Sequence, residues 1–62
     1  MLQVGDKVRT KHTEWDIEMI PAGTEIVLIR PNDVKADYWY GTTILQDRDR
    51  MVLVLAANLE NC

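Results

Sequence analysis

Three consecutive aromatic side chains, Tyr38, Trp39 and Tyr40, are the residues in this sequence best suited to binding chemistry. Side chains alternate between the two faces of a strand, so Trp39 would lie on one face and both tyrosines on the other. Tyr and Trp are enriched at binding hot spots because they bury a large area at little entropic cost. If Trp39 packs inward, the tyrosines form an exposed patch. The alternative is that all three residues only make cross-strand pairs.

The fourth aromatic residue, Trp15, lies in a polar stretch that shows neither a strand nor a helix period. It could join the tyrosines in a concave aromatic patch, flanked by the carboxylates of Glu14, Asp16 and Glu18. Such a patch would suit a basic or aliphatic segment of a partner. The alternative is that Trp15 caps the hydrophobic core, since a chain without phenylalanine has few large side chains for that task.

Three basic residues, Lys7, Arg9 and Lys11, share one face of a predicted strand by their spacing of two. They make the best case for a nucleic-acid surface, with the aromatic residues as stacking platforms. Seven Lys and Arg against ten Asp and Glu leave a formal charge of −3, however, which repels a phosphate backbone. We therefore do not expect nucleic acid to be the partner.

Catalytic and metal-binding chemistry is not supported by any motif. His12 has no companion cysteine, histidine or carboxylate at ligand spacing, and a structural zinc site needs four ligands. No nucleophile stands with an acid-base partner in a recognisable arrangement. We expect a chain that is not an enzyme and that binds no cofactor or metal, with Cys62 incidental.

Length and composition favour one globular domain near the lower size limit for folding without metal or disulfide staples. A hydrophobic fraction of 47% with 27% charged residues is typical of folded proteins. From the lone cysteine and the lack of a signal-peptide pattern we expect a cytoplasmic protein. Because the sequence starts with Met1 and carries no tag or linker residues, we also expect a complete chain. The longest apolar run, residues 51–57, falls far short of the roughly 20 residues that cross a membrane.

Short β-rich segments separated by turn residues predict an all-β fold with four or five strands. A long loop is expected over residues 11–22, a charged hairpin turn over 46–49 and a single 3₁₀ turn near 56–59. Gly41 indicates a bulge or a close backbone approach inside its strand. A helix is the rival interpretation of residues 51–55. The main strands are expected at about residues 7–10, 24–30, 38–45 and 51–55.

The order of these segments resembles the small bacterial SH3-like barrels, of the kind found in the small barrel subunit of photosystem I, the variable chain of ferredoxin-thioredoxin reductase and the nitrile hydratase beta subunit. The resemblance covers most of the chain. It is carried by Gly5-Asp6-Lys7-Val8-Arg9, Ile20-Pro21-Ala22-Gly23-Thr24, Tyr38-Trp39-Tyr40-Gly41 and Ala57-Asn58-Leu59-Glu60.

The resemblance implies a five-stranded, partly open barrel whose members often dock on larger proteins as accessory subunits. The chain lacks the Ala-Leu-Tyr-Asp-Tyr segment of eukaryotic signalling SH3 domains, which argues against binding of proline-rich peptides. It resembles the KOW domains only in the step Gly23-Thr24. We therefore expect residues 1–62 to form one SH3-like barrel that binds a larger protein or complex as an accessory or regulatory subunit. A nucleic-acid-binding barrel and a homo-oligomeric structural protein are the alternatives.

Overall fold

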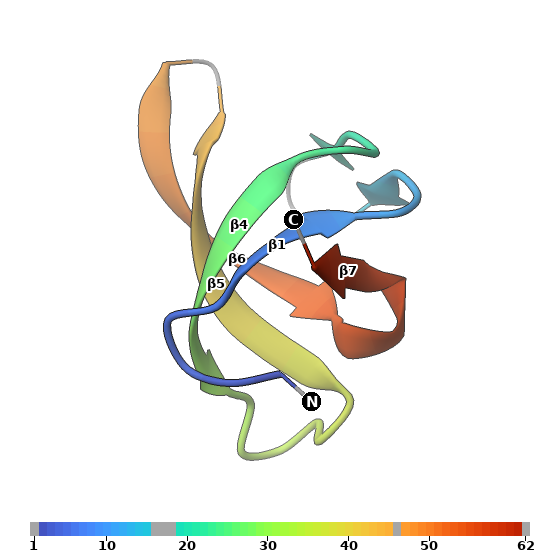
Figure 1. The fold of residues 1–62 in the computed structure, drawn as a ribbon, viewed down its shortest axis with the longest axis vertical. Helices are drawn as coiled ribbons and strands as arrows, with labels where there is room; N and C mark the ends of the chain where they lie inside the picture. Colours follow the sequence, from blue (N-terminus) through green and yellow to red (C-terminus); the bar gives the residue numbers. More distant parts are fainter. Residues whose placement is uncertain (1, 16–18, 46, 62) are drawn as a thin grey trace.

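Seven β-strands and one 3₁₀ turn make up the computed structural model, which describes residues 2–15, 19–45 and 47–61 (Figure 1). The only helical element described is this three-residue turn, so no described helix is long enough to cross a membrane. The elements in chain order are β1 (Lys7–Thr10), β2 (Glu14–Trp15), β3 (Met19–Ile20), β4 (Glu25–Pro31), β5 (Tyr38–Leu45), β6 (Arg48–Leu55), η1 (Ala56–Asn58) and β7 (Leu59–Asn61).

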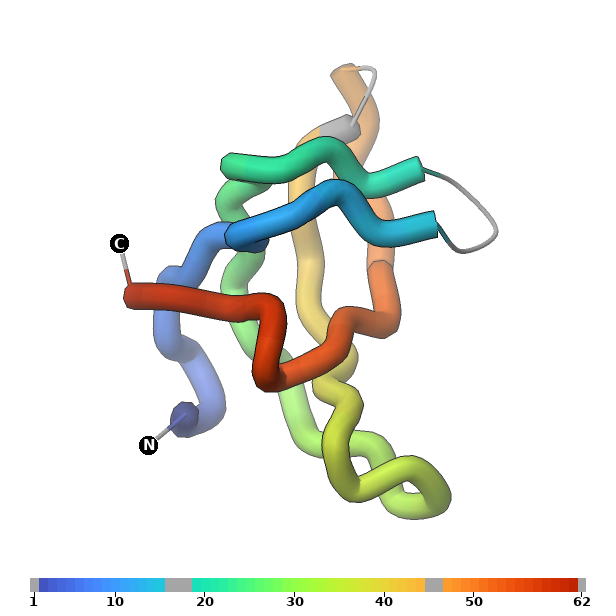
Figure 2. The backbone as a smooth tube through the Cα atoms, turned by 90° about the vertical axis from the view of Figure 1, so that its right-hand side faces the viewer, coloured from blue at the N-terminus to red at the C-terminus, as the bar shows by residue number. Residues whose placement is uncertain are grey.

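Five strands form one antiparallel sheet in the order β6-β5-β4-β1-β7. The two remaining strands, β2 and β3, pair with each other in a short ribbon that continues from β1 and β4 (Figure 2). The sheet twists strongly, and the β5–β6 hairpin projects beyond the rest of the chain (Figure 1). Within the described residues no pairing joins the edge strands β6 and β7, so the sheet is not closed into a barrel.

The core follows from the period-2 pattern of the strands. In β1, Val8 and Thr10 are buried while Lys7 and Arg9 are exposed, and in β4 the buried positions are Ile26 and Leu28. Full burial of a valine, isoleucine or leucine side chain contributes roughly 1.5–3 kcal/mol to the free energy of folding relative to an exposed side chain. The buried apolar residues are Val8, Ile20, Ile26, Leu28, Val54 and Leu59, with Leu2, Trp39 and Val52 packed against them.

Several expected elements are confirmed. Strands β1 and β5 have the predicted bounds, β4 lies one residue later than expected, and η1 stands directly before the last strand. The charged turn is shorter than expected, because β6 begins at Arg48 and pairs with β5 from Leu45 onward. Asp47 takes a φ of 62°, a left-handed conformation that Asp tolerates better than most residues. The helical alternative for residues 51–55 is wrong.

The prediction of a long loop over residues 11–22 needs correction, because part of this segment is a strand pair. Glu14 pairs with Ile20 and Trp15 with Met19, which gives the two-residue strands of the ribbon. Strands this short leave no visible period in the sequence. Thr10 closes the base of the ribbon, because its hydroxyl donates to the carbonyl of Pro21 and its carbonyl accepts from the N–H of Gly23.

Gly41 marks a close approach between neighbouring strands, as the sequence predicted. Its position in β5 is buried, and a Cβ built there would overlap the Cγ2 methyl of Ile26 and lie 3.1 Å from the carbonyl oxygen of Val27. Gly41 pairs with Leu28 on one side and with Val52 on the other. The missing side chain therefore leaves space for the core residue of the adjacent strand.

We expect Gly41→Ala to lower the free energy of unfolding by about 2 kcal/mol, since the added methyl overpacks the contact with Ile26. Urea unfolding followed by circular dichroism measures the effect. The matched control is Thr42→Ala at the next, exposed position of β5, for which a loss below about 1 kcal/mol is expected. Equal losses in the two variants would contradict the close-packing argument.

Candidate functional site

The aromatic cluster of β5 divides between the two faces of the sheet. Trp39 packs against the core, while Tyr38 and Tyr40 lie on the opposite face and are only partly buried. There Tyr38 pairs with Leu55 and Tyr40 with Leu53 of β6. The tyrosines thus form cross-strand pairs, as the alternative interpretation expected, and remain partly exposed on the outer surface.

A bulge in β4 brings a cation onto this outer face. The register advances by one residue in β5, from Gly41 to Tyr40, while it advances by two in β4, from Leu28 to Arg30. Because a bulge re-aims the side chains that follow it, Arg30 rather than Ile29 stands opposite Tyr40. The guanidinium carbon of Arg30 lies 4.6 Å from the centroid of the Tyr40 ring, a cation–π contact.

The loop between β4 and β5 supplies a second cation, Lys35, to this outer face. The side-chain oxygen of Asn32 accepts hydrogen bonds from the N–H groups of Val34 and Lys35, both at 2.8 Å, which folds the loop back on itself. The N–H of Tyr38 donates to the carbonyl of Lys35 at 3.0 Å. This arrangement leaves the Lys35 ammonium 5.5 Å from the centroid of the Tyr38 ring.

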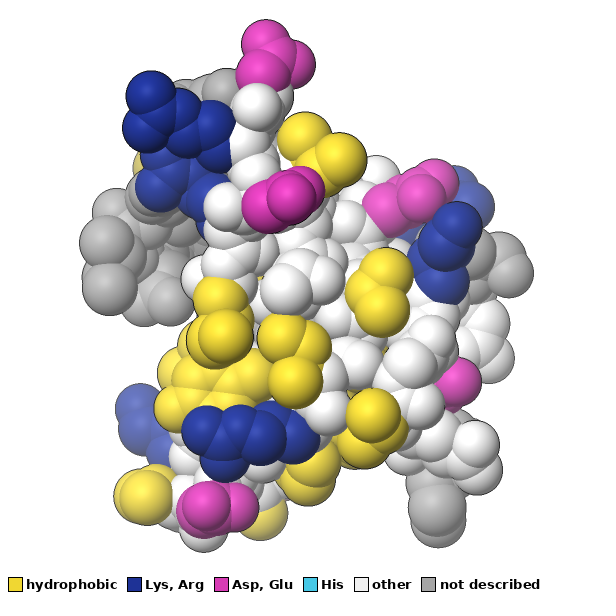
Figure 3. All heavy atoms as spheres, turned by 90° about the vertical axis from the view of Figure 1, so that its left-hand side faces the viewer, with side chains coloured by type: hydrophobic (Ala, Val, Ile, Leu, Met, Phe, Trp, Pro, Cys, Tyr) yellow, Lys and Arg dark blue, Asp and Glu magenta, His cyan; other side chains and the backbone are white. Residues whose placement is uncertain are grey.

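Tyr40 and the two cations border a hollow of about 240 Å³ on the outer face, which we call the tyrosine hollow. On this side of the molecule hydrophobic side chains gather in the lower part, with basic side chains across and beside them (Figure 3). The carboxylate of Asp33 lies 3.7 Å from the Arg30 guanidinium, and both side chains are largely exposed. The lining residues are Arg30, Asn32, Asp33, Val34, Lys35, Tyr40 and Leu53.

Tyr38 lies between the tyrosine hollow, to which its partner Lys35 belongs, and a second hollow next to the 3₁₀ turn, which Tyr38 lines and whose walls are held by the buried side chain of Asn58. The Asn58 amide donates to the carbonyl of His12 at 2.9 Å and to the Glu14 carboxylate at 2.8 Å, and its oxygen accepts from the His12 N–H. The other Glu14 oxygen accepts from the N–H of Leu55. Asn58 therefore ties the beginning of the ribbon to the end of β6. The lining residues are His12, Thr13, Glu14, Tyr38, Leu55, Ala57 and Asn58.

Trp15 is separate from the tyrosines. Its side chain is 79% exposed at the end of β2, and it lines neither hollow that the tyrosines border. The interpretation of Trp15 as a core cap is therefore wrong, and the structure does not bring it into one patch with Tyr38 and Tyr40. Asp16, predicted beside it, lies outside the described residues.

The three basic residues of the alternative site are exposed, with Lys7 and Arg9 on the outer face of β1. Acidic residues flank them. The register places Glu25 of β4 and Glu60 of β7 on either side of Arg9. These carboxylates offset the positive potential that a nucleic-acid surface requires.

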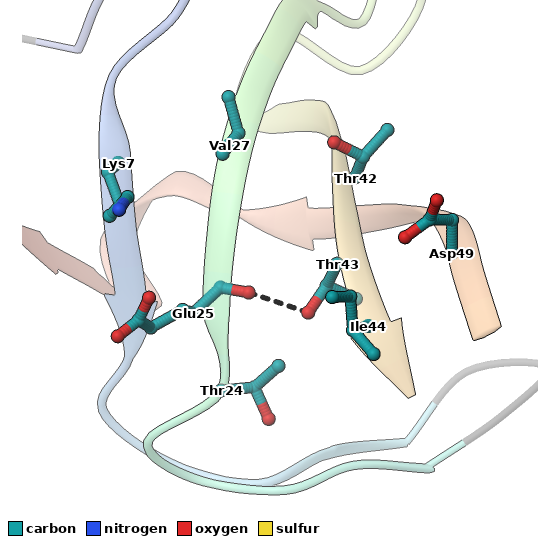
Figure 4. A pocket seen from close by; sticks show the side chains of 8 residues that line it. All are labelled: Lys7, Thr24, Glu25, Val27, Thr42, Thr43, Ile44 and Asp49. Atoms are coloured by element: carbon teal, nitrogen blue, oxygen red, sulfur yellow. Dashed lines mark hydrogen bonds between the residues drawn. The ribbon is translucent and has the colours of Figure 1, made fainter. Parts of the chain in front are cut away.

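A broader depression of about 640 Å³ extends over the same outer face, with side chains from four strands around it (Figure 4). The Thr43 hydroxyl there donates to the carbonyl of Glu25 at 2.6 Å. Exposed Val27 and Ile44 contribute apolar surface, and exposed Met51 pairs with Thr42. The sequence analysis did not single out these three apolar residues. Each lies two positions from an exposed polar residue of its own strand, and this spacing places it on the outer face. The depression is lined by Lys7, Thr24, Glu25, Val27, Thr42, Thr43, Ile44 and Asp49.

Comparison with models of protein families, with curated proteins and with solved structures found no match to this chain. Within residues 2–15, 19–45 and 47–61, no group of three or more histidine, cysteine or acidic side chains could hold a metal ion. The site is therefore interpreted from its own contacts, which are apolar, aromatic and charged.

We expect Asn58→Ala to lower the free energy of unfolding by about 2 kcal/mol, because it leaves buried hydrogen-bonding groups unpaired. Hydrogen exchange provides a local measurement: the amides of His12 and Leu55 should exchange faster, relative to those of β4 and β5, than in the unmodified chain. Asn61→Ala, an exposed asparagine of β7, is the matched control. Unchanged relative exchange at His12 would show that Asn58 does not hold the ribbon.

Proposed function

We propose that this chain is a non-catalytic protein-binding module of the SH3-like barrel class, which docks on a larger protein through the tyrosine hollow. It would serve there as a small accessory or regulatory subunit. The observation that carries the proposal is the outward placement of Tyr38 and Tyr40, each beside a leucine of β6 and beneath a cation.

The arrangement of elements supports the SH3-like class. Five antiparallel strands form one strongly twisted sheet, a long connection follows the first strand, and a 3₁₀ turn comes before the last strand. The resemblance implied the five strands, and the long connection and the 3₁₀ turn were expected from the residues themselves. The order β6-β5-β4-β1-β7 is compatible with a partly open barrel.

The composition of the outer face supports a protein partner. Tyrosine and arginine are the residue types that most often dominate binding energy at protein interfaces, and here they stand together. Apolar Leu53 and exposed Val34 line the same hollow, so it combines an apolar floor with a charged rim. A hollow of this size suits one or two side chains of a partner.

Replacement of both tyrosines by alanine should abolish capture of the partner while the fold survives. Burial of an aromatic anchor at an interface is typically worth more than about 2 kcal/mol, so the double variant Tyr38→Ala/Tyr40→Ala should bind more than tenfold more weakly. The measurement is quantitative pull-down from lysate of the cells that encode the chain, with circular dichroism establishing that each variant is folded.

Trp15→Ala is the control for this experiment, because it removes an exposed aromatic residue outside the hollow. A partner retained by Trp15→Ala and lost by the tyrosine variant supports the proposal. Loss with Trp15→Ala alone would place binding on the ribbon instead. Recovery of nucleic acid would favour the basic face, and recovery of only the chain itself would favour self-association through the apolar surface of Val27, Ile44 and Met51.

A further inference from the structure

The charges around the tyrosine hollow indicate what kind of partner segment it accepts. Each tyrosine ring already carries one of the chain's own cations, Arg30 over Tyr40 and Lys35 over Tyr38. An aromatic face occupied in this way cannot take a second cation from a partner without displacing the first. A basic segment, which the flanking acids in the sequence suggested, would therefore meet like charge at this site.

The contact with Tyr40 leaves the Arg30 guanidinium able to bind an anion. The guanidinium carries five N–H donors, more than one cation–π contact can occupy. Asp33 already shows that a carboxylate can approach: one of its oxygens lies 3.7 Å from the Arg30 Nη1 atom, longer than a hydrogen bond. The guanidinium thus retains donors for a second carboxylate.

The net charge of the hollow also favours an acidic partner segment. Of the residues that line the hollow, Arg30 and Lys35 are positive and Asp33 is negative, which gives 2 − 1 = +1 for the hollow, although the whole chain carries −3. At physiological salt the Debye length is about 8 Å, so contacts within the hollow outweigh the charge of the rest of the chain.

We propose that the tyrosine hollow binds an acidic, aliphatic segment of the partner protein. One carboxylate pairs with Arg30, a second pairs with Lys35, and an aliphatic side chain between them packs on Val34 and Leu53. This inference rests on the proposed function and adds the chemistry of the partner segment. The bulge of β4 serves it directly, because without the bulge Ile29 would take the place of Arg30 opposite Tyr40.

Three synthetic peptides test the inference on the intact chain: acetyl-Gly-Glu-Leu-Glu-Gly-amide and its counterparts with Gln or Lys in place of Glu. Titration followed by amide chemical shifts in NMR measures each affinity. The Glu peptide should shift the amides of residues 30, 32–35 and 40. The Gln peptide should bind about tenfold more weakly, because charge-assisted hydrogen bonds are roughly twice as strong as neutral ones.

Three variants test whether the two cations cause the effect. Arg30→Gln/Lys35→Gln should weaken binding of the Glu peptide about tenfold. The matched control Lys11→Gln/Arg48→Gln removes the same charge from exposed positions outside the hollow and should change the affinity less than about twofold. Asp33→Asn removes the internal competitor and should tighten binding, a gain that damage to the fold cannot produce.

Equal affinity for the Glu, Gln and Lys peptides, or no binding of any of them, would overturn the inference. So would an equal loss in the two double variants, because the effect would then come from net charge alone. The outcome for the proposed function stays separate. If the tyrosine variant loses the captured partner while Arg30→Gln/Lys35→Gln retains it, the hollow is still the docking site but acidity does not select the partner.

Discussion

Ile26 occupies the space where any side chain at position 41 would have to lie, and this contact brings β4 and β5 close together in the centre of the sheet. The core methyl of β4 fills the gap left by glycine, and the sheet can then curl around the apolar residues of its inner face. The inward position of Gly41 also determines which side chains of β5 face outward. With positions 39, 41 and 43 facing inward, positions 38 and 40 must face outward.

The outer surface depends on this alternation of side chains and on one β-bulge that interrupts the strand pairing. The bulge after Leu28 shifts β4 by a residue and sets Arg30 against the Tyr40 ring. The Asx-type turn at Asn32 does the equivalent for Lys35 and Tyr38. The second hollow, bordered by Tyr38, has a different support, since Asn58 holds the ribbon there through hydrogen bonds to His12 and Glu14. Each hollow therefore has a wall held by the hydrogen bonds of an asparagine side chain, Asn32 in one and Asn58 in the other.

Much of the sheet could be predicted because strand periodicity is a local property. The bounds of β1 and β5, the close approach at Gly41 and the 3₁₀ turn were all visible in runs of fewer than ten residues. The ribbon was missed because two residues cannot show a period. The start of β6 was misplaced because Arg48 and Asp49 look like turn residues, although an edge strand accommodates charge.

The site was harder to predict than the fold for a similar reason. The sequence indicated the tyrosines, but their contacts depend on the register between strands, and a bulge is not visible in the sequence of one strand. Arg30 and Lys35 were therefore not predicted as site residues. Trp15 was predicted to lie beside the tyrosines, and its exposed position does not support that prediction. The expected partner chemistry was based on acids near Trp15, and the observed contacts point instead to the cations above the rings.

Site-specific photo-crosslinking tests most directly whether this outer face is the binding surface. A benzophenone amino acid would replace Val34, which lines the tyrosine hollow and is 91% exposed, or Val4, which is 68% exposed and lines neither hollow beside the tyrosines. Because both side chains are exposed, neither replacement should disturb the core. Our account predicts that irradiation in the cells that encode the chain yields a protein adduct from position 34 and none from position 4. An adduct from position 4 with none from position 34 would contradict it.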